Sequence, residues 1–142
     1  LSLRLEKGFG IWSAEFTQGY TPGMTGMDRW IDWEKENFIG QAAAIKERDG
    51  NGPAQKLVML EIDADDADAS GYEPVWNNDS LVGFVTSGGY GHTLKKSLAM
   101  ALVNNDLAQE DQKLKVHVVG VEKDATVIQA SPYDPDGSVM RV

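Results

Sequence analysis

The feature that most constrains this chain is a change in the period of its apolar residues at about residue 54. Beyond this point the apolar residues come in short runs of strand length, and turn-forming residues separate the runs. The first run, residues 57–62, is apolar in both phases and predicts a strand that is buried on both faces or nearly so. The other runs are residues 74–76, 81–86, 97–103, 113–119 and 125–130, with turns expected at residues 77–80 and 120–124. Short strands joined only by turns predict a mainly β fold, either a small antiparallel barrel or a sandwich. We expect one closed or nearly closed barrel over residues 57–130.

The first 53 residues carry a different pattern. The opening residues LSLRLE fit a strand by alternation and equally fit the last turns of a helix, and spacing alone leaves both open. Residues 17–27 hold a proline and three glycines, which predicts a loop. Residues 38–48 place apolar side chains on one helical face, with Asn37 as the expected N-cap. Gly and Pro residues then end this helix, so we divide the chain into an α/loop segment, residues 1–53, and a β-barrel domain, residues 54–142.

Composition excludes several classes of function. The 142-residue chain has no cysteine, which rules out disulfides, thiolate metal ligands and a catalytic thiol. Its net charge of −9 disfavours partners with anionic backbones or surfaces, so we expect neither nucleic-acid nor membrane binding. The acidic residues 63–71 lack the spacing of an EF-hand and are interpreted as a solvated loop. The two histidines, His92 and His117, are too far apart for the HExxH zinc pattern, and we expect no metal site.

Catalytic candidates are few. The glycine-rich residues 87–92 follow a strand but lead into another strand, so a strand connection that uses left-handed glycines is favoured over a phosphate-binding loop. His117 lies in an alternating run and is interpreted as structural. Trp30 and Trp33 are interpreted as core or interface residues in preference to a platform for stacking on a flat ring. No catalytic residue is therefore assigned to this chain.

Five motifs in order carry a resemblance to a known family. They are LRLEKGFGIWSAEFT, YTP, FIGQAAAI, VGFVTSGGYGHTLKKSLAMALV and SPYDP, and together they span almost the whole chain. The chain resembles the C-terminal part of the folate-binding aminomethyltransferases, a family that includes the glycine-cleavage T-protein. It is most similar to the folate half of the dimethylglycine and sarcosine dehydrogenases. Trp12 stands where T-proteins tend to have Tyr, and the TSGGYGHTLKKSLA string also favours the dehydrogenase branch.

The resemblance implies both a fold and a reaction. Residues 1–53 would close a folate-binding α+β core, and residues 54–142 would form the family's C-terminal barrel. In such enzymes a flavin domain with FAD oxidises a small N-methyl amine, and the folate domain captures the one-carbon unit on tetrahydrofolate. The alternatives are a glycine-cleavage T-protein, which has no flavin domain, and a non-catalytic barrel that docks onto a neighbouring domain. The implied location is the cytoplasm, or the mitochondrial matrix in a eukaryote.

The same resemblance suggests five cofactor-binding residues. Phe9 and Trp12 would form walls of the folate slot, Arg4 and Glu6 would support the core, and Tyr133 would approach the folate tail. The family's catalytic Asp, the folate core and the flavin domain are expected upstream of Leu1. Pairing of Arg4 and Glu6 with residues upstream of Leu1 is the alternative to a role in the folate site. We therefore expect that the chain was cut from a longer parent and that by itself it is inactive.

The first segment carries a heavy load of large apolar side chains for its length. If this segment completes a core formed with other parts of a parent protein, these side chains should leave an unusually large apolar surface exposed. They are Phe9, Trp12, Phe16, Trp30, Ile31 and Trp33.

Overall fold

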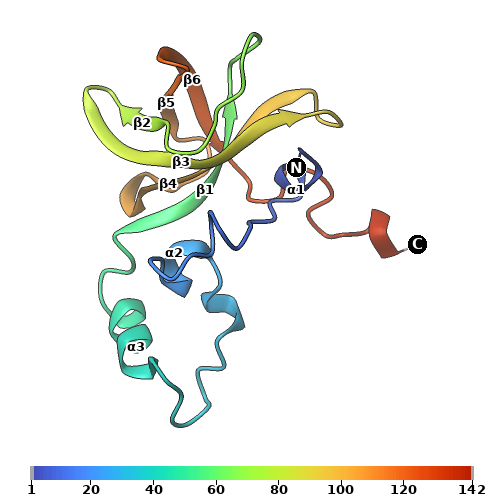
Figure 1. Cartoon of the computed structure of the whole chain (residues 1–142). Coiled ribbons are helices and arrows are strands. Elements are labelled where there is room, and N and C mark those ends of the chain that lie inside the picture. The colour runs from blue at the N-terminus through green and yellow to red at the C-terminus, as the bar shows by residue number, and fades with distance from the viewer. Residues whose placement is uncertain (1, 142) are drawn as a thin grey trace.

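A closed β-barrel dominates the computed structural model, which describes residues 2–141 and, for Met140, the backbone alone (Figure 1). Its strands are β1 (Gln55–Ile62), β2 (Pro74–Asn77), β3 (Ser80–Gly91), β4 (Lys96–Asn104), β5 (Lys113–Val118) and β6 (Val121–Ile128). The strand order is β1-β4-β3-β2-β5-β6, and β6 pairs with β1 to close the ring. Every neighbouring pair is antiparallel. The predicted antiparallel barrel is confirmed.

Alternate side chains of each strand fill the barrel. On β1 the inward residues are Val58, Leu60 and Ile62, and Leu60 has no exposed surface. Small residues keep the interior narrow where strands approach closely. At Gly83 an added Cβ would lie 2.0 Å from the carbonyl oxygen of Leu102, so β3 and β4 pack at a distance that only glycine allows.

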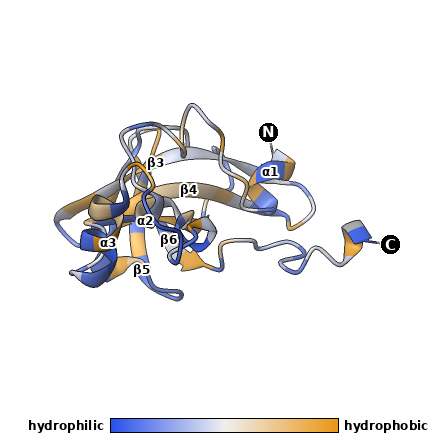
Figure 2. Cartoon of the chain, turned by 90° about the horizontal axis from the view of Figure 1, so that it is seen from below, coloured by the Kyte–Doolittle hydropathy of each residue, from blue (hydrophilic) through white to orange (hydrophobic). Residues whose placement is uncertain are grey.

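A second apolar layer lies outside the barrel, beneath α1 (Ser2–Glu6). Leu5 of α1 packs there against outward-facing side chains of β1 and β4: Met59, Leu98 and Met100. In Figure 2, α1 lies beside the ends of β3 and β4. Because α1 covers the outer face of β1, this strand is nearly buried on both faces, as the sequence predicts. The opening residues therefore form a helix and not a strand.

The segment between α1 and the barrel is more ordered than predicted. Residues 17–27 include a one-turn helix, α2 (Pro22–Thr25), and the prediction of a loop is wrong there. Thr21 caps this helix by accepting a hydrogen bond from Met24 N at 3.2 Å, proline suits its first turn, and Gly26 ends it with φ 68°. A short 3-10 helix, η1 (Asp28–Trp30), follows.

The next helix begins later than predicted. α3 spans Gln41–Asp49, and its N-cap is Gly40 rather than Asn37. Asn37 and Gly40 both adopt left-handed backbone angles, φ 57° and 87°, so a helix cannot run through them. The predicted end, within the Gly-rich residues 49–53, agrees with the structure.

Two turns also differ from the prediction. β3 continues through the glycine-rich residues, which were expected to connect strands. Gly88 in this part of β3 packs closely against the acidic loop, since an added Cβ would lie 2.2 Å from the Ala69 carbonyl oxygen. The last hairpin turns at Val119 and Gly120, both with positive φ, so β6 begins at Val121 and not near residue 125.

Two more 3-10 turns, η2 (Asn105–Leu107) and η3 (Val139–Arg141), complete the elements. None of the helices in residues 2–141 has the length and apolar character that crossing a membrane requires.

Candidate functional site

The five residues suggested by the sequence lie on one side of the barrel. Arg4 and Glu6 belong to α1, Phe9 and Trp12 to the loop that follows it, and Tyr133 to the segment after β6. Figure 1 shows α1 beside that C-terminal segment. The two meet closely at Gly8, whose φ of 69° ends the helix and whose Cβ, if present, would lie 1.9 Å from the carbonyl oxygen of Ala130.

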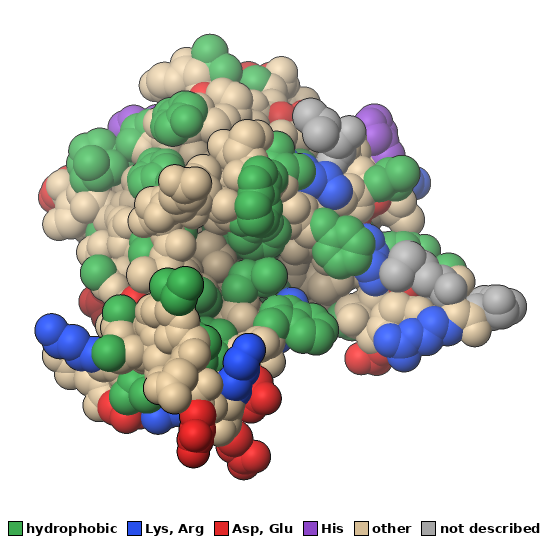
Figure 3. Space-filling view, turned by 60° about the horizontal axis from the view of Figure 1, so that its bottom comes forward, with side chains coloured by type: hydrophobic (Ala, Val, Ile, Leu, Met, Phe, Trp, Pro, Cys, Tyr) green, Lys and Arg blue, Asp and Glu red, His purple; other side chains and the backbone are tan. Residues whose placement is uncertain are grey.

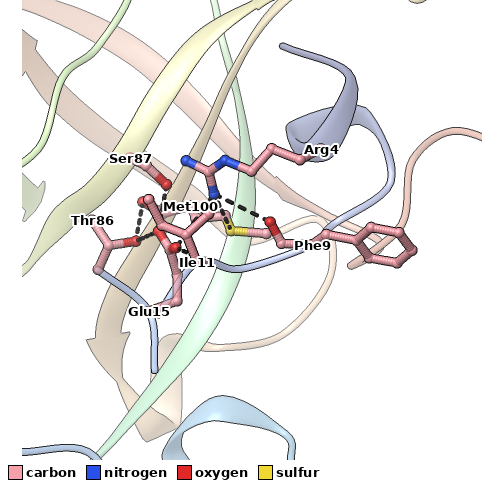
Figure 4. A network of polar contacts seen from close by, with 7 residues as sticks. All are labelled: Arg4, Phe9, Ile11, Glu15, Thr86, Ser87 and Met100. Carbon is pink, nitrogen blue, oxygen red and sulfur yellow. Dashed lines mark hydrogen bonds and ion pairs between the residues drawn. The ribbon is translucent and has the colours of Figure 1, made fainter. Parts of the chain in front are cut away.

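Arg4 forms an ion pair with a buried carboxylate in the loop (Figure 4). Its Nη1 lies 3.3 Å from Glu15 Oε2 and donates to the Phe9 carbonyl at 3.2 Å, with the sulfur of Met100 at 3.7 Å. The Nε of Arg4 is buried and has no hydrogen-bond partner among the described residues. The carboxylate that pairs with Arg4 thus lies within this chain, which spacing alone left open.

Glu15 is the site residue that the sequence reasoning missed. It has no exposed surface, and its carboxylate also accepts hydrogen bonds from Ile11 N at 2.8 Å, from Thr86 Oγ1 at 2.7 Å and from the Ser87 hydroxyl. A signal was available, because Glu15 is the only charged residue between Lys7 and Asp28. A lone charge among aromatic and small residues indicates a buried, partnered group.

Glu6 faces the opposite way and fixes the turn between β3 and β4. Its Oε1 accepts hydrogen bonds from Thr93 N at 2.7 Å and Leu94 N at 2.9 Å. Burial acts to raise the pKa of Glu6, but hydrogen bonds from Leu94 and Thr93 and the charge of nearby His92 outweigh it and hold the pKa below its ordinary value. Glu6 therefore supports the fold through Oε1, whose two partners lie within the chain.

Tyr133 lies in the segment after β6, residues 129–134, which contacts α1 and is called the strap below. Its backbone N–H donates to the Glu6 carbonyl at 2.8 Å. The next residue, Asp134, contacts Lys7 of the loop after α1. Lys7 Nζ lies 2.5 Å from the Asp134 carbonyl oxygen and 3.4 Å from its Oδ2. Burial acts to raise the pKa of Asp134, but hydrogen bonds from Ser138, Val139 N and Lys7 lower it overall. The strap thus brings Tyr133 to the same side as Arg4 and Glu6.

Phe9 and Trp12 are the exposed members of the set. Trp12 is 84% exposed and Phe9 55% exposed, and in Figure 4 the Phe9 ring points away from the Arg4 network. An open hollow of about 560 Å³ is lined by Ser2, Leu3, Arg4, Ile11 and His92. Arg4 therefore lines a hollow, and Ile11, which also lines it, directly precedes the exposed Trp12 in the sequence.

The six large apolar side chains of residues 1–53 are only partly buried. Trp30 is 73% exposed, and together with Phe9 and Trp12 it contributes to the hydrophobic side chains at the surface, of which Figure 3 shows one face. Phe16, Ile31 and Trp33 are half-buried. The predicted exposure of this segment agrees with the structure. Trp33 also packs against the Arg48 guanidinium, 4.5 Å from its ring centroid.

A second hollow, of about 1010 Å³, lies under the acidic loop at the mouth of the barrel. Carboxylates and lysines both line it, and at its edge Lys96 pairs with Glu61 of β1 at 2.5 Å. Asp66 of the loop pairs with Lys123 at 3.0 Å. Within residues 2–141 no three His, Asp or Glu side chains gather in a way that could hold a metal ion. His117 stacks on Trp76 at 5.4 Å between ring centroids, in keeping with a structural role.

The arrangement around Arg4 suits recognition of a flat, anionic molecule. A guanidinium group binds carboxylates and ring carbonyls through its N–H groups, and an exposed indole offers a surface on which a planar ring can stack. Neither Arg4 nor Glu15 is placed as a nucleophile or base, because each is engaged with the other.

Comparison with known proteins places the barrel in a family. Residues 55–134 match the sequence profile described as the glycine cleavage T-protein C-terminal barrel domain. The chain is 36% identical over 129 residues to the human protein "Dimethylglycine dehydrogenase, mitochondrial", an alignment that covers 90% of this chain and 15% of that protein. It is 30% identical over 132 residues to an aminomethyltransferase of Caldanaerobacter subterraneus, covering 93% of this chain and 35% of that one.

The fold agrees with these matches. The crystal structure of the glycine cleavage system aminomethyltransferase T from Bartonella henselae superposes with a TM-score of 0.84 and 25% sequence identity. The superposition covers 94% of this chain and 37% of that one. The chain thus spans well under half the length of the relatives it matches.

Proposed function

Since the chain belongs to the glycine cleavage T-protein C-terminal barrel domain family, we propose that it is the C-terminal part of a tetrahydrofolate-dependent one-carbon-transfer enzyme of the dimethylglycine dehydrogenase type. In this proposal an N-methyl amine is oxidised elsewhere in the protein, and its one-carbon unit passes to tetrahydrofolate. Tetrahydrofolate supplies the nitrogen atoms that accept this unit. The residues of this chain bind and orient, and catalytic groups come from another part of the polypeptide.

The observation that carries the proposal is the guanidinium of Arg4, held by Glu15 and by the Phe9 carbonyl, beside a loop on which the side chains of Phe9 and Trp12 are exposed. Folate is a flat pterin ring joined to an anionic glutamate tail, and the rim of a site for such a molecule needs a cation and a flat apolar wall. Arg4 lines the open hollow, and its hydrogen bonds within residues 2–141 all use Nη1, so Nη2 remains as a donor for a ligand. In the same proposal Tyr133, held by the strap, approaches the folate tail, and Glu6 supports the site from behind.

A charge-conserving substitution tests this role. In the complete polypeptide that contains this chain, we expect Arg4→Lys to weaken binding of 5-formyltetrahydrofolate about tenfold, because a lysine cannot reproduce the planar arrangement of guanidinium donors. Arg29→Lys is the matched control, since Arg29 is exposed and lies over Trp30, 5.6 Å from its ring centroid. Isothermal calorimetry gives both affinities. If Arg4→Lys binds as tightly as the unaltered protein, Arg4 is not part of the rim.

The aminomethyltransferase itself remains the second candidate, because bacterial aminomethyltransferases match over an equal share of this chain. FAD distinguishes the two: we expect the complete polypeptide to show flavin absorbance if it is of the dehydrogenase type and none if it is a T-protein. The third candidate is a barrel that only docks onto a neighbouring domain, and it would retain stability but show no folate binding. The name of the human relative includes "mitochondrial", which supports the matrix as the location in a eukaryote.

A further inference from the structure

We propose that Glu15 is the positioning residue of this site: it fixes Arg4 and the loop that carries Trp12 as one unit against the barrel, and so sets folate affinity through Arg4. The inference rests on the proposed function. It goes beyond it because neither the motifs nor the matches assign a role to Glu15.

The first support is the division of labour between the two carboxylate oxygens. Oε1 is held from the barrel, by the hydroxyls of Thr86 and Ser87. Oε2 is left for the site, where it meets Ile11 N at 2.8 Å and Arg4 Nη1 at 3.3 Å. Ile11 directly precedes Trp12. One rigidly held carboxylate therefore sets the position of both the guanidinium and the exposed indole.

The second support is a β-bulge that exists where Glu15 binds. The pairing of β3 with β4 goes from Val85–Ala101 directly to Ser87–Met100, so Thr86 is an extra residue in the strand. In a regular strand Thr86 and Ser87 would point to opposite faces of the sheet. The bulge turns both hydroxyls toward the same oxygen of Glu15, and bulges commonly re-aim side chains in this way next to functional sites.

The third support is the cost of the arrangement. A fully buried carboxylate is unfavourable unless charge and hydrogen bonds compensate it, and a loop could be anchored by apolar side chains instead. Glu15 receives hydrogen bonds from three separate segments, α1, its own loop and β3. An apolar anchor would need no cation, whereas Arg4 beside an open hollow needs a counter-ion, which the buried carboxylate of Glu15 supplies.

A double-mutant cycle tests the inference in the complete polypeptide. Glu15→Gln keeps the size and one acceptor but removes the charge, and we expect it to weaken 5-formyltetrahydrofolate binding roughly tenfold, within the range of coupling between contacting residues. If Glu15 acts through Arg4, the same substitution made on an Arg4→Gln background causes little further loss. Glu73→Gln is the matched control, because Glu73 also accepts hydrogen bonds from backbone N–H groups, those of Ser70 and Val119, and forms no ion pair within residues 2–141.

Additive losses in the cycle, or unchanged affinity in Glu15→Gln, would overturn the inference. A second measurement covers the case in which the unaltered protein does not bind folate, which would refute the proposed function alone. Hydrogen exchange of the Ile11 amide then decides the role of Glu15. Faster exchange in both Glu15→Gln and Arg4→Gln, but not in Glu73→Gln, supports positioning of the loop, and protection unchanged in all three refutes it.

Discussion

Removal of the Glu6 carboxylate should destabilise the chain because two backbone N–H groups depend on it. In Glu6→Ala the amides of Thr93 and Leu94 lose their acceptor, and each buried unpaired donor costs about 1–3 kcal/mol. Thr93 is exposed and Leu94 half-buried, so water relieves part of this cost and the sum lies at about 2–4 kcal/mol. Glu6→Gln keeps an acceptor at the same place and loses only the charge. We expect this loss to weaken each of the two hydrogen bonds by about 1 kcal/mol.

The free energy of unfolding in urea measures this series directly. We expect the order of stability to be unaltered chain, Glu6→Gln, Glu6→Ala, with the slope of the transition unchanged. Glu110→Gln, at an exposed position, serves as the control and should change stability by no more than about 0.5 kcal/mol. A Glu6→Ala variant as stable as this control would show that the turn between β3 and β4 does not rely on the carboxylate.

The pH dependence follows from the direction of the Glu6 pKa. Hydrogen bonds and His92 outweigh burial and lower this pKa in the folded chain, so the folded state favours the ionised form. The stabilisation is therefore fully present above the ordinary glutamate range, near pH 4.3, and is lost as the pH falls through the lowered folded value. Glu6→Gln lacks this contribution, so its stability should fall less steeply in acid than that of the unaltered chain.

Three further predictions concern the core, the barrel mouth and the exposed face. Leu60→Ala should cost about 2–5 kcal/mol in urea denaturation, because it opens a cavity in the barrel interior; a cost below about 1 kcal/mol would contradict the packing. Gly88→Ala should lower the melting temperature because its Cβ meets the Ala69 carbonyl oxygen at 2.2 Å, while Gly19→Ala, with no contact closer than 3.7 Å, should not. The isolated chain should bind tetrahydrofolate weakly or not at all by calorimetry and should self-associate in sedimentation; Trp12→Ser should reduce the association, and a strictly monomeric unaltered chain would contradict this.

The strands of the barrel could be predicted because each strand and turn depends on residues that are close together in the sequence. The apolar runs of strand length, such as residues 57–62, and the turn residues between them indicate the strands, and the structure confirms the antiparallel ring. The turn at residues 120–124 was misplaced because Val119 adopts a left-handed conformation that a β-branched residue rarely takes. Its neighbours across the hairpin, and not its own preference, determine that conformation.

The site was harder to predict because its contacts join distant segments. Arg4 and Glu15 are separated by 11 residues, and the hydroxyls that hold Glu15 lie more than 70 residues further along. No spacing rule links such positions, so family resemblance suggested Arg4, Glu6, Phe9, Trp12 and Tyr133 but gave no partner for any of them. The start of α3 was misplaced for a simpler reason, because Asn37 is as compatible with a left-handed bend as with an N-cap.

The pairing of β6 with β1 determines the order in which the molecule can assemble. Residues 59–62 find their partners at 125–128, so the ring cannot close on the ribosome until residue 128 has emerged. α1 contacts the β3–β4 turn and the segment around Tyr133, and both are synthesised after α1. This helix therefore docks fully only after those later segments are available. Contacts of such high sequence separation make folding slow.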